Sequence, residues 1–172
     1  MSANISIQPA TAQDWPDIWA MIAPVFRAGQ TYAVDRNVSE ADAKAIWVLA
    51  PSHGYILRDP DGTALATYYL KPNFGGPAQQ AANCGYIVSE AGRGRGLAKL
   101  MCRHSQAEAI KTGFKAMVFN CVVATNTIAV KTWLDEGFAI IGTLPKIFDH
   151  PQDGWVDAHI MHKTLGAEVS GG

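Results

Sequence analysis

The stretch "CGYIVSEAGRGRGLAKLM", residues 84–101, runs from an apolar strand-like segment through a glycine and arginine cluster into a helix-like segment. Glycines at such a junction remove the side chains that would keep a ligand away from the backbone, and they permit tight dihedral angles. The following helix presents unpaired amide hydrogens and the positive end of its dipole. This pattern is typical of a phosphate site, to which Arg93 and Arg95 add positive charge.

Two familiar phosphate-binding motifs do not match this cluster. The dinucleotide spacing G-x-G-x-x-G is absent, because Leu97 and not glycine stands three residues after Gly94. A Walker loop is absent as well, since no Gly-Lys-Ser/Thr follows. Taken alone, the cluster is equally consistent with a tight glycine turn whose two arginines are solvated.

Apolar patterns on either side predict further strands and helices. The strand-like segments are residues 4–8, 54–70 (a hairpin that turns between Asp59 and Gly62), 81–88, 115–123, 138–144 and 155–163. The helix-like segments are residues 11–29, 39–49, 97–112 and 125–137. Strand–helix–strand units predict parallel pairing and hairpins predict antiparallel pairing, so we expect an α/β fold of the α+β type with one mixed sheet.

Composition narrows the class of protein. With 172 residues, 48% of them hydrophobic, we expect one domain over residues 1–165 and a flexible tail over 166–172. The net charge is −1 and the basic residues are scattered, so we expect no nucleic-acid partner. The three cysteines lack the spacing of a disulfide framework or a metal site, so we expect no metal. Without a leader-like start or a long apolar run, we expect a cytoplasmic protein without membrane contact.

The quoted stretch resembles the acetyl-CoA loop of the GCN5-related N-acetyltransferase (GNAT) superfamily. The loop has the pattern Gln/Arg-x-x-Gly-x-Gly/Ala, which reads here as Arg93, Gly96 and Ala98. In that superfamily a strand and a helix follow, carrying an Asn, an Ala, usually a Tyr, and then Gly-Phe. At those spacings this sequence has Asn126, Ala129, Trp133 and Gly137-Phe138. With two N-terminal helices and a hairpin before the loop, the resemblance covers nearly the whole chain.

The resemblance implies an acetyl-CoA-dependent N-acetyltransferase with a mostly antiparallel sheet of about seven strands and helices on both faces. It also implies that the strand at residues 86–88 diverges from the next strand and that residues 93–98 wrap the pyrophosphate. The expected acetyl-CoA-binding residues are Tyr86, Ile87, Val88, Arg93, Gly94, Arg95, Gly96, Leu97, Ala98, Asn126 and Ala129. Transfer would be direct, in a ternary complex, with the Val88 backbone amide stabilising the oxyanion.

Two further residues are catalytic candidates. Trp133 stands where the superfamily often has a tyrosine that acts as general acid, and an indole N–H donates a hydrogen bond without supplying a proton. Trp133 is therefore expected to donate a hydrogen bond to the sulfur of the leaving thiolate, to form a wall of the site, or only to contribute to the packing of its helix. Asn120 lies in the apolar segment "MVFNCVV", where alternation predicts that it shares a buried face with Val118 and Val122. The Asn120 amide either finds its hydrogen-bond partners within the core or binds the acceptor or a water molecule. It cannot act as a base, because it is an amide.

The acceptor candidates lie outside these motifs. We expect the acceptor pocket to draw on Tyr32, Asn73 and Asp157, with Asp149, His150 and His159 as further candidates. A histidine could act as the base near neutral pH, whereas His104 is expected to be structural. Asn126 is expected to cap its helix as well as to contact pantetheine.

The sequence also leads to expectations about the acceptor, about oligomeric state and about an alternative function. The segments "FNCVVATN", "TLPKIFDHP" and "WVDAHIMHK" are similar to a branch that includes acetyltransferases of azetidine-2-carboxylate, so we expect a small-molecule amine, amino acid or imino acid. Relatives are frequently dimers, which makes a homodimer a further expectation. The alternative is a non-catalytic acyl-CoA sensor with the same fold, suggested by Trp133 in the tyrosine position.

Overall fold

Seven strands and four α-helices are present in the computed structural model, which describes residues 4–166. The strands are β1 (Ser6–Pro9), β2 (His53–Arg58), β3 (Ala64–Pro72), β4 (Ala81–Val88), β5 (Ala116–Val123), β6 (Ala139–His150) and β7 (Gly154–Thr164). The helices are α1 (Trp15–Ala28), α2 (Glu40–Trp47), α3 (Leu97–Lys111) and α4 (Thr127–Asp135). The expected tail lies outside the described residues, apart from Gly166.

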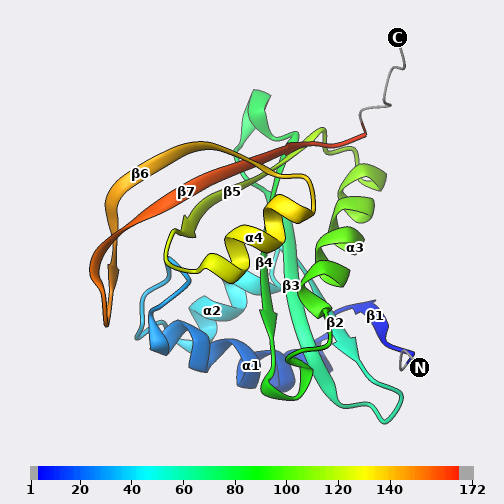
Figure 1. The fold of residues 1–172 in the computed structure, drawn as a ribbon. Coiled ribbons are helices and arrows are strands. Elements are labelled where there is room, and N and C mark those ends of the chain that lie inside the picture. Colours follow the sequence, from blue (N-terminus) through cyan, green and yellow to red (C-terminus); the bar gives the residue numbers. More distant parts are fainter. Residues whose placement is uncertain (1–3, 167–172) are drawn as a thin grey trace.

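The strands form one sheet in the order β1-β2-β3-β4-β5-β7-β6 (Figure 1). Every neighbouring pair is antiparallel except β4 and β5, which run parallel. The predicted mixed, mostly antiparallel sheet is therefore confirmed. The β4–β5 pair is also the shortest, because only Ala81 and Ala82 of β4 are in register with β5.

Helices cover both faces of the sheet, as expected. On one face α3 packs on Tyr68, Leu70 and Met117, and on the other α1 and α2 pack on Ile56 and Tyr69. Adjacent residues of β3 thus contribute to different cores, because successive side chains of a strand point to opposite faces. Figure 1 shows the central strands between α3 and the α1–α2 pair.

The last hairpin is longer than the sequence predicts. The apolar run suggests that β6 ends at residue 144, but β6 continues to His150 and forms a curved arm with β7 (Figure 1). A register shift between Leu144 and Phe148 absorbs Pro145, and Lys146 adopts a φ of 47° within it. β6 is an edge strand, where a proline removes no ladder hydrogen bond, so strand pairing resumes after the bulge.

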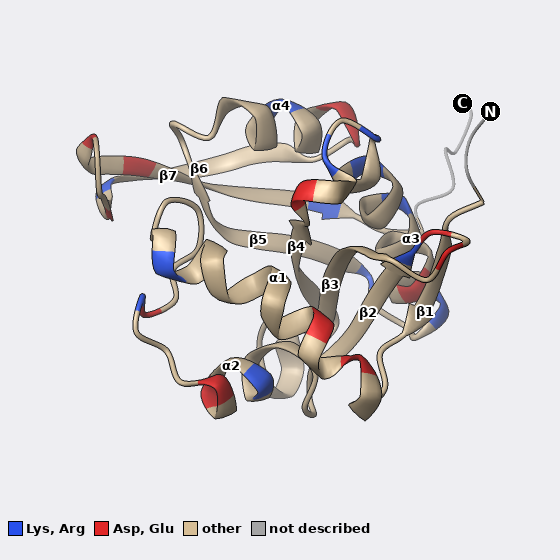
Figure 2. Ribbon diagram, turned by 90° about the horizontal axis from the view of Figure 1, so that it is seen from below, with Lys and Arg blue, Asp and Glu red and all other residues tan. Residues whose placement is uncertain are grey.

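The tip of this arm contacts the segment between α1 and α2. Arg36 Nη2 donates to the backbone oxygen of Asp149 (2.9 Å), and Gln30 Nε2 donates to Gln152 Oε1 (3.1 Å). Basic and acidic residues are interspersed along the ribbon in the view of Figure 2. Within residues 4–166, no helix has both the length and the apolar character needed to cross a membrane.

Candidate active site

The two parallel strands diverge after their first two residues, and this opens the site. Peptide N–H groups alternate between the two edges of a strand. The N–H of Ser89 donates to Leu65 O on the β3 side (2.8 Å), so the N–H of Val88 points toward the split. The carbonyl of Tyr86 also points into the split, where it accepts from the Tyr32 hydroxyl (2.9 Å).

Asn83 joins the two strands where their own pairing stops. Its Nδ2 donates to Val118 O on β5 (2.9 Å), and its Oδ1 accepts from the Tyr69 hydroxyl (2.8 Å). The side-chain amide thus replaces a missing ladder hydrogen bond. Asn83 is not among the predicted site residues, although it is a polar residue in the apolar strand "AANCGYIV", the same signal that makes Asn120 a candidate.

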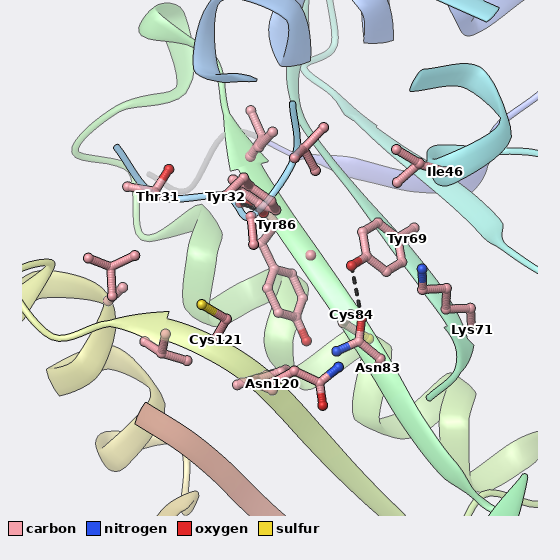
Figure 3. Close-up of a pocket in the computed structure, with 18 of the residues that line it drawn as sticks. Thr31, Tyr32, Ile46, Tyr69, Lys71, Asn83, Cys84, Tyr86, Asn120 and Cys121 are labelled. Carbon is pink, nitrogen blue, oxygen red and sulfur yellow. Dashed lines mark hydrogen bonds between the residues drawn. The ribbon is translucent and has the colours of Figure 1, made fainter. Parts of the chain in front are cut away.

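A cavity of about 670 Å³ occupies the split and continues beneath the α1–α2 segment (Figure 3). The structure brings together nine of the predicted site residues in its lining. They are Tyr32, Asn73, Tyr86, Ile87, Val88, Asn120, Asn126, Ala129 and Trp133. Residues 93–98 follow β4 after a short 3-10 turn (Glu90–Gly92) and lie outside the cavity lining.

The loop of residues 93–98 offers backbone donors at the start of α3. Gly94 and Gly96 have φ angles of 71° and 72°, a region that glycine adopts without strain. Among the described residues, the amides of Gly94, Arg95 and Gly96 have no hydrogen-bond acceptor, and the first amides of α3 have none within the helix. Arg93 and Arg95 are exposed and make no ion pair within residues 4–166. Free donors and two guanidiniums together suit a pyrophosphate.

The start of α4 faces the same cavity. The Asn126 side chain caps the helix, accepting from the N–H of Ala129 (3.3 Å), as predicted. Trp133 packs against Tyr86 and Phe119, with ring centroids 5.0 and 5.3 Å apart. Its indole N–H has no acceptor in the described part of the chain, so it can still donate to a ligand.

Asn120 does not have the predicted burial. A bulge between Phe119 and Val122 interrupts the alternation of β5, so Val118 and Val122 are buried while Asn120 is exposed. Its amide instead forms a reciprocal pair with that of Asn73, with N···O distances of 2.9 and 2.6 Å. This pair links the end of β3 to β5 across the narrow end of the split.

The part of the cavity beneath α1 and α2 is here called the acceptor chamber. Its floor consists of two cross-strand pairs, Tyr69 with Gly85 and Lys71 with Asn83. A Cβ on Gly85 would lie 2.5 Å from Tyr69 Cε1 and 3.1 Å from the Tyr32 ring, so glycine lets both rings pack on β4. Burial raises the pKa of both tyrosines well above the usual range, so their hydroxyls stay protonated and act as donors.

The candidates on the last hairpin do not line the cavity. Asp157 accepts from the N–H of Lys146 (2.9 Å), and His159 Nδ1 pairs with Thr143 Oγ1 (2.9 Å). His150 and Asp149 lie at the tip of the arm, where His150 Nδ1 accepts from the amides of Gln152 and Asp153. His104 bonds the Tyr68 hydroxyl through Nδ1 (2.7 Å) beside α3.

The cavity carries little charge. Lys71 is the only Lys, Arg, His, Asp or Glu residue among the described residues that line the cavity. Within residues 4–166, no three or more His, Cys, Asp or Glu residues are grouped as metal ligands. The cavity offers hydrogen-bond donors, amides and aromatic rings, but its lining contains neither a carboxylate nor an imidazole.

Comparison with known proteins agrees with this geometry. Residues 15–138 match the family model described as "Acetyltransferase (GNAT) family". The chain is 29% identical over 150 residues to N-acetyltransferase aca1 of Schizosaccharomyces pombe, which covers 77% of this chain and 71% of that protein.

Solved structures extend the comparison to the fold. A GCN5-related N-acetyltransferase from Kribbella flavida has a TM-score of 0.89 and 37% identity, covering 94% of this chain and 98% of that one. A GNAT superfamily phosphinothricin acetyltransferase from Sinorhizobium meliloti, solved in complex with acetyl-CoA, has a TM-score of 0.83 and 18% identity. That alignment covers 100% of this chain and 93% of that one, and it shows a likeness of fold.

The environments of the cysteines predict their order of reactivity. Burial raises the pKa of Cys84 to about 12 and that of Cys102 to about 11, and it raises the pKa of the half-buried Cys121. Because the thiolate is the reactive form, iodoacetamide at pH 8 should label Cys121 first and leave Cys84 and Cys102 largely unlabelled. Peptide mass spectrometry on native and urea-unfolded protein measures this, and native labelling of Cys84 as fast as Cys121 would contradict the assignment.

Proposed function

Because the chain belongs to the acetyltransferase (GNAT) family, we propose that it transfers an acetyl group from acetyl-CoA to the amine of a small molecule. The observation that carries the proposal is the split between β4 and β5, which ends at a loop of free amides and two arginines. The split suits an extended thioester arm and the loop suits a pyrophosphate.

The residues that would hold acetyl-CoA come from three elements. The free edge of β4 would bind the pantetheine arm through Tyr86, Ile87 and Val88, and the loop would bind the pyrophosphate. From α4, Asn126 would offer its amide Nδ2, because its Oδ1 already caps the helix. The fit rests on donors that have no protein acceptor among the described residues.

Transfer would be direct, with both substrates in one cavity. Attack by an amine on a thioester places negative charge on the carbonyl oxygen, and the N–H of Val88 is directed into the split where that charge would form. An acetyl-cysteine intermediate is disfavoured, because burial raises the pKa of both cavity cysteines, Cys84 and Cys121.

Proton transfer would depend on solvent and on the acceptor itself. The cavity lining has no carboxylate or imidazole, and its buried tyrosines stay protonated. The acceptor would therefore lose one proton to water and attack as a neutral amine, and the proton that the attacking nitrogen still carries would pass to water as the CoA thiolate leaves. Trp133 would donate a hydrogen bond to the departing sulfur without supplying a proton.

The chemical class of the acceptor is a narrower proposal. We infer a small amino or imino acid, in line with the sequence resemblance to azetidine-2-carboxylate acetyltransferases, and that narrower assignment stays a prediction. Support comes from the chamber, which combines two tyrosine rings, amides and aliphatic walls in a restricted volume. Asn73 and Asn120 are occupied with each other and would have to exchange partners to bind an acceptor.

A variant of the loop tests the binding site of acetyl-CoA. Gly96→Glu introduces bulk and negative charge where the pyrophosphate would lie, so acetyl-CoA affinity measured by calorimetry should fall at least about 100-fold. Gly113→Glu is the matched control, because Gly113 also has a positive φ (94°) and open space within 4 Å of where a Cβ would lie, but it follows the other end of α3. Equal affinity in folded Gly96→Glu and Gly113→Glu proteins would remove the loop from the site.

Replacement of Trp133 distinguishes between an acetyltransferase and a non-catalytic acyl-CoA sensor. Trp133→Phe keeps aromatic packing against Tyr86 and Phe119 but removes the indole N–H. For an enzyme we expect kcat to fall by about 3- to 30-fold, the loss of one hydrogen bond, while acetyl-CoA affinity changes less than about 2-fold. Thiol release monitored with a panel of amines measures kcat. If the wild-type protein binds acetyl-CoA and releases no thiol with any amine, the sensor alternative replaces the enzyme.

A further inference from the structure

We propose that Lys71 binds the carboxylate of the acceptor and so makes the protein selective for amino or imino acids over amines that lack an acid group. The inference rests on the proposed acetyl transfer, because it concerns the second substrate of the same cavity. It assigns a specificity-determining role to a residue that no sequence motif marks.

The first observation is that Lys71 supplies the charge of the cavity and has no ionic partner. Among the lining residues it is the one member of the Lys, Arg, His, Asp and Glu group. Within residues 4–166 its ammonium makes no salt bridge and no hydrogen bond to protein, whereas Lys99 and Lys131 both pair with Asp135. A half-buried cation without a counterion favours an anionic ligand.

The second observation is the direction of the side chain. Lys71 Nζ lies 5.0 Å from the centre of the Tyr69 ring, in a cation–π contact that holds the ammonium over the chamber floor. Tyr69 pairs with Gly85 and Lys71 pairs with Asn83, and the Tyr69 hydroxyl bonds Asn83 Oδ1, so the ammonium lies beside the floor that these residues form. Figure 3 shows Lys71, Tyr69 and Asn83 together on this side of the cavity.

The rest of the chamber fits the remainder of such an acceptor. Its walls carry Val25, Val34, Ile46 and Pro51, which suit a short aliphatic chain or a small ring. No carboxylate of the lining competes for Lys71 or holds the amine as an ammonium. An acceptor whose acid group binds Lys71 would therefore place its amine away from the cation, on the side of the split.

Equilibrium binding tests the inference without requiring turnover. The probes are two matched pairs, L-azetidine-2-carboxylate with azetidine and L-proline with pyrrolidine, titrated calorimetrically into the full chain with and without CoA. The variant is Lys71→Met, which keeps the aliphatic stem, and Lys71→Arg should preserve binding because it keeps the charge. Lys115→Met is the matched control, because Lys115 is exposed and lies outside the cavity. Lys71→Gln serves if the Met variant does not fold.

We expect the wild-type protein and Lys115→Met to bind each acid about 10- to 100-fold more tightly than its decarboxylated analogue, and Lys71→Met to lose that preference. Affinity for the analogues and for CoA should stay within about 2-fold in all variants. Equal binding of acids and analogues by the wild type, no binding of any acid, or a preference that survives in folded Lys71→Met would overturn the inference. Acid-selective binding through Lys71 without acetyl-CoA binding would leave the inference standing while removing the proposed transfer.

Discussion

The divergence of β4 from β5 is the constraint on which the rest of the site depends. Two parallel strands in one sheet normally satisfy each other's backbone groups along their length, and here they do so for two residues only. The Asn83 amide bonds Val118 O and Tyr32 bonds Tyr86 O, so side chains replace part of the missing ladder. The N–H of Val88 stays without a strand partner, and an opening lined by backbone donors is the result.

Different elements around this opening carry different polar and charged groups, and each set of groups suits a different part of the ligands. The loop after β4 carries two arginines and free amides, which suit phosphate groups, whereas the chamber beneath α1 and α2 carries Lys71 and protonated tyrosines. Each end thus carries cationic side chains that can attract an anion, and the stretch between them has no charged side chain among the described residues. Two anionic molecules bound in this way would meet at the split, where proximity does most of the catalytic work.

Much of this arrangement could be predicted from sequence, because local patterns determine it. The order of elements, the mixed sheet and the glycine loop follow from periodicity and turn residues. The exposure of Asn120 could not be predicted, since the bulge in β5 depends on its pairing with β7 and not on its own sequence. Similarly, Asn83 and Lys71 become a site only when β3 and β4 pair in register, and Asp157 is directed to Lys146 by the long β6–β7 arm.

Hydrogen exchange on addition of acetyl-CoA tests the central claim most directly, because the claim concerns backbone amides that lack protein partners. With saturating acetyl-CoA, we expect slower exchange at Val88 and at the amides of residues 94–98, which have no protein acceptor within residues 4–166. Exchange in α2 and at the tip of the β6–β7 hairpin should not change. Unchanged exchange in residues 86–98 under conditions where acetyl-CoA is bound, or protection confined to another part of the chain, would contradict the account.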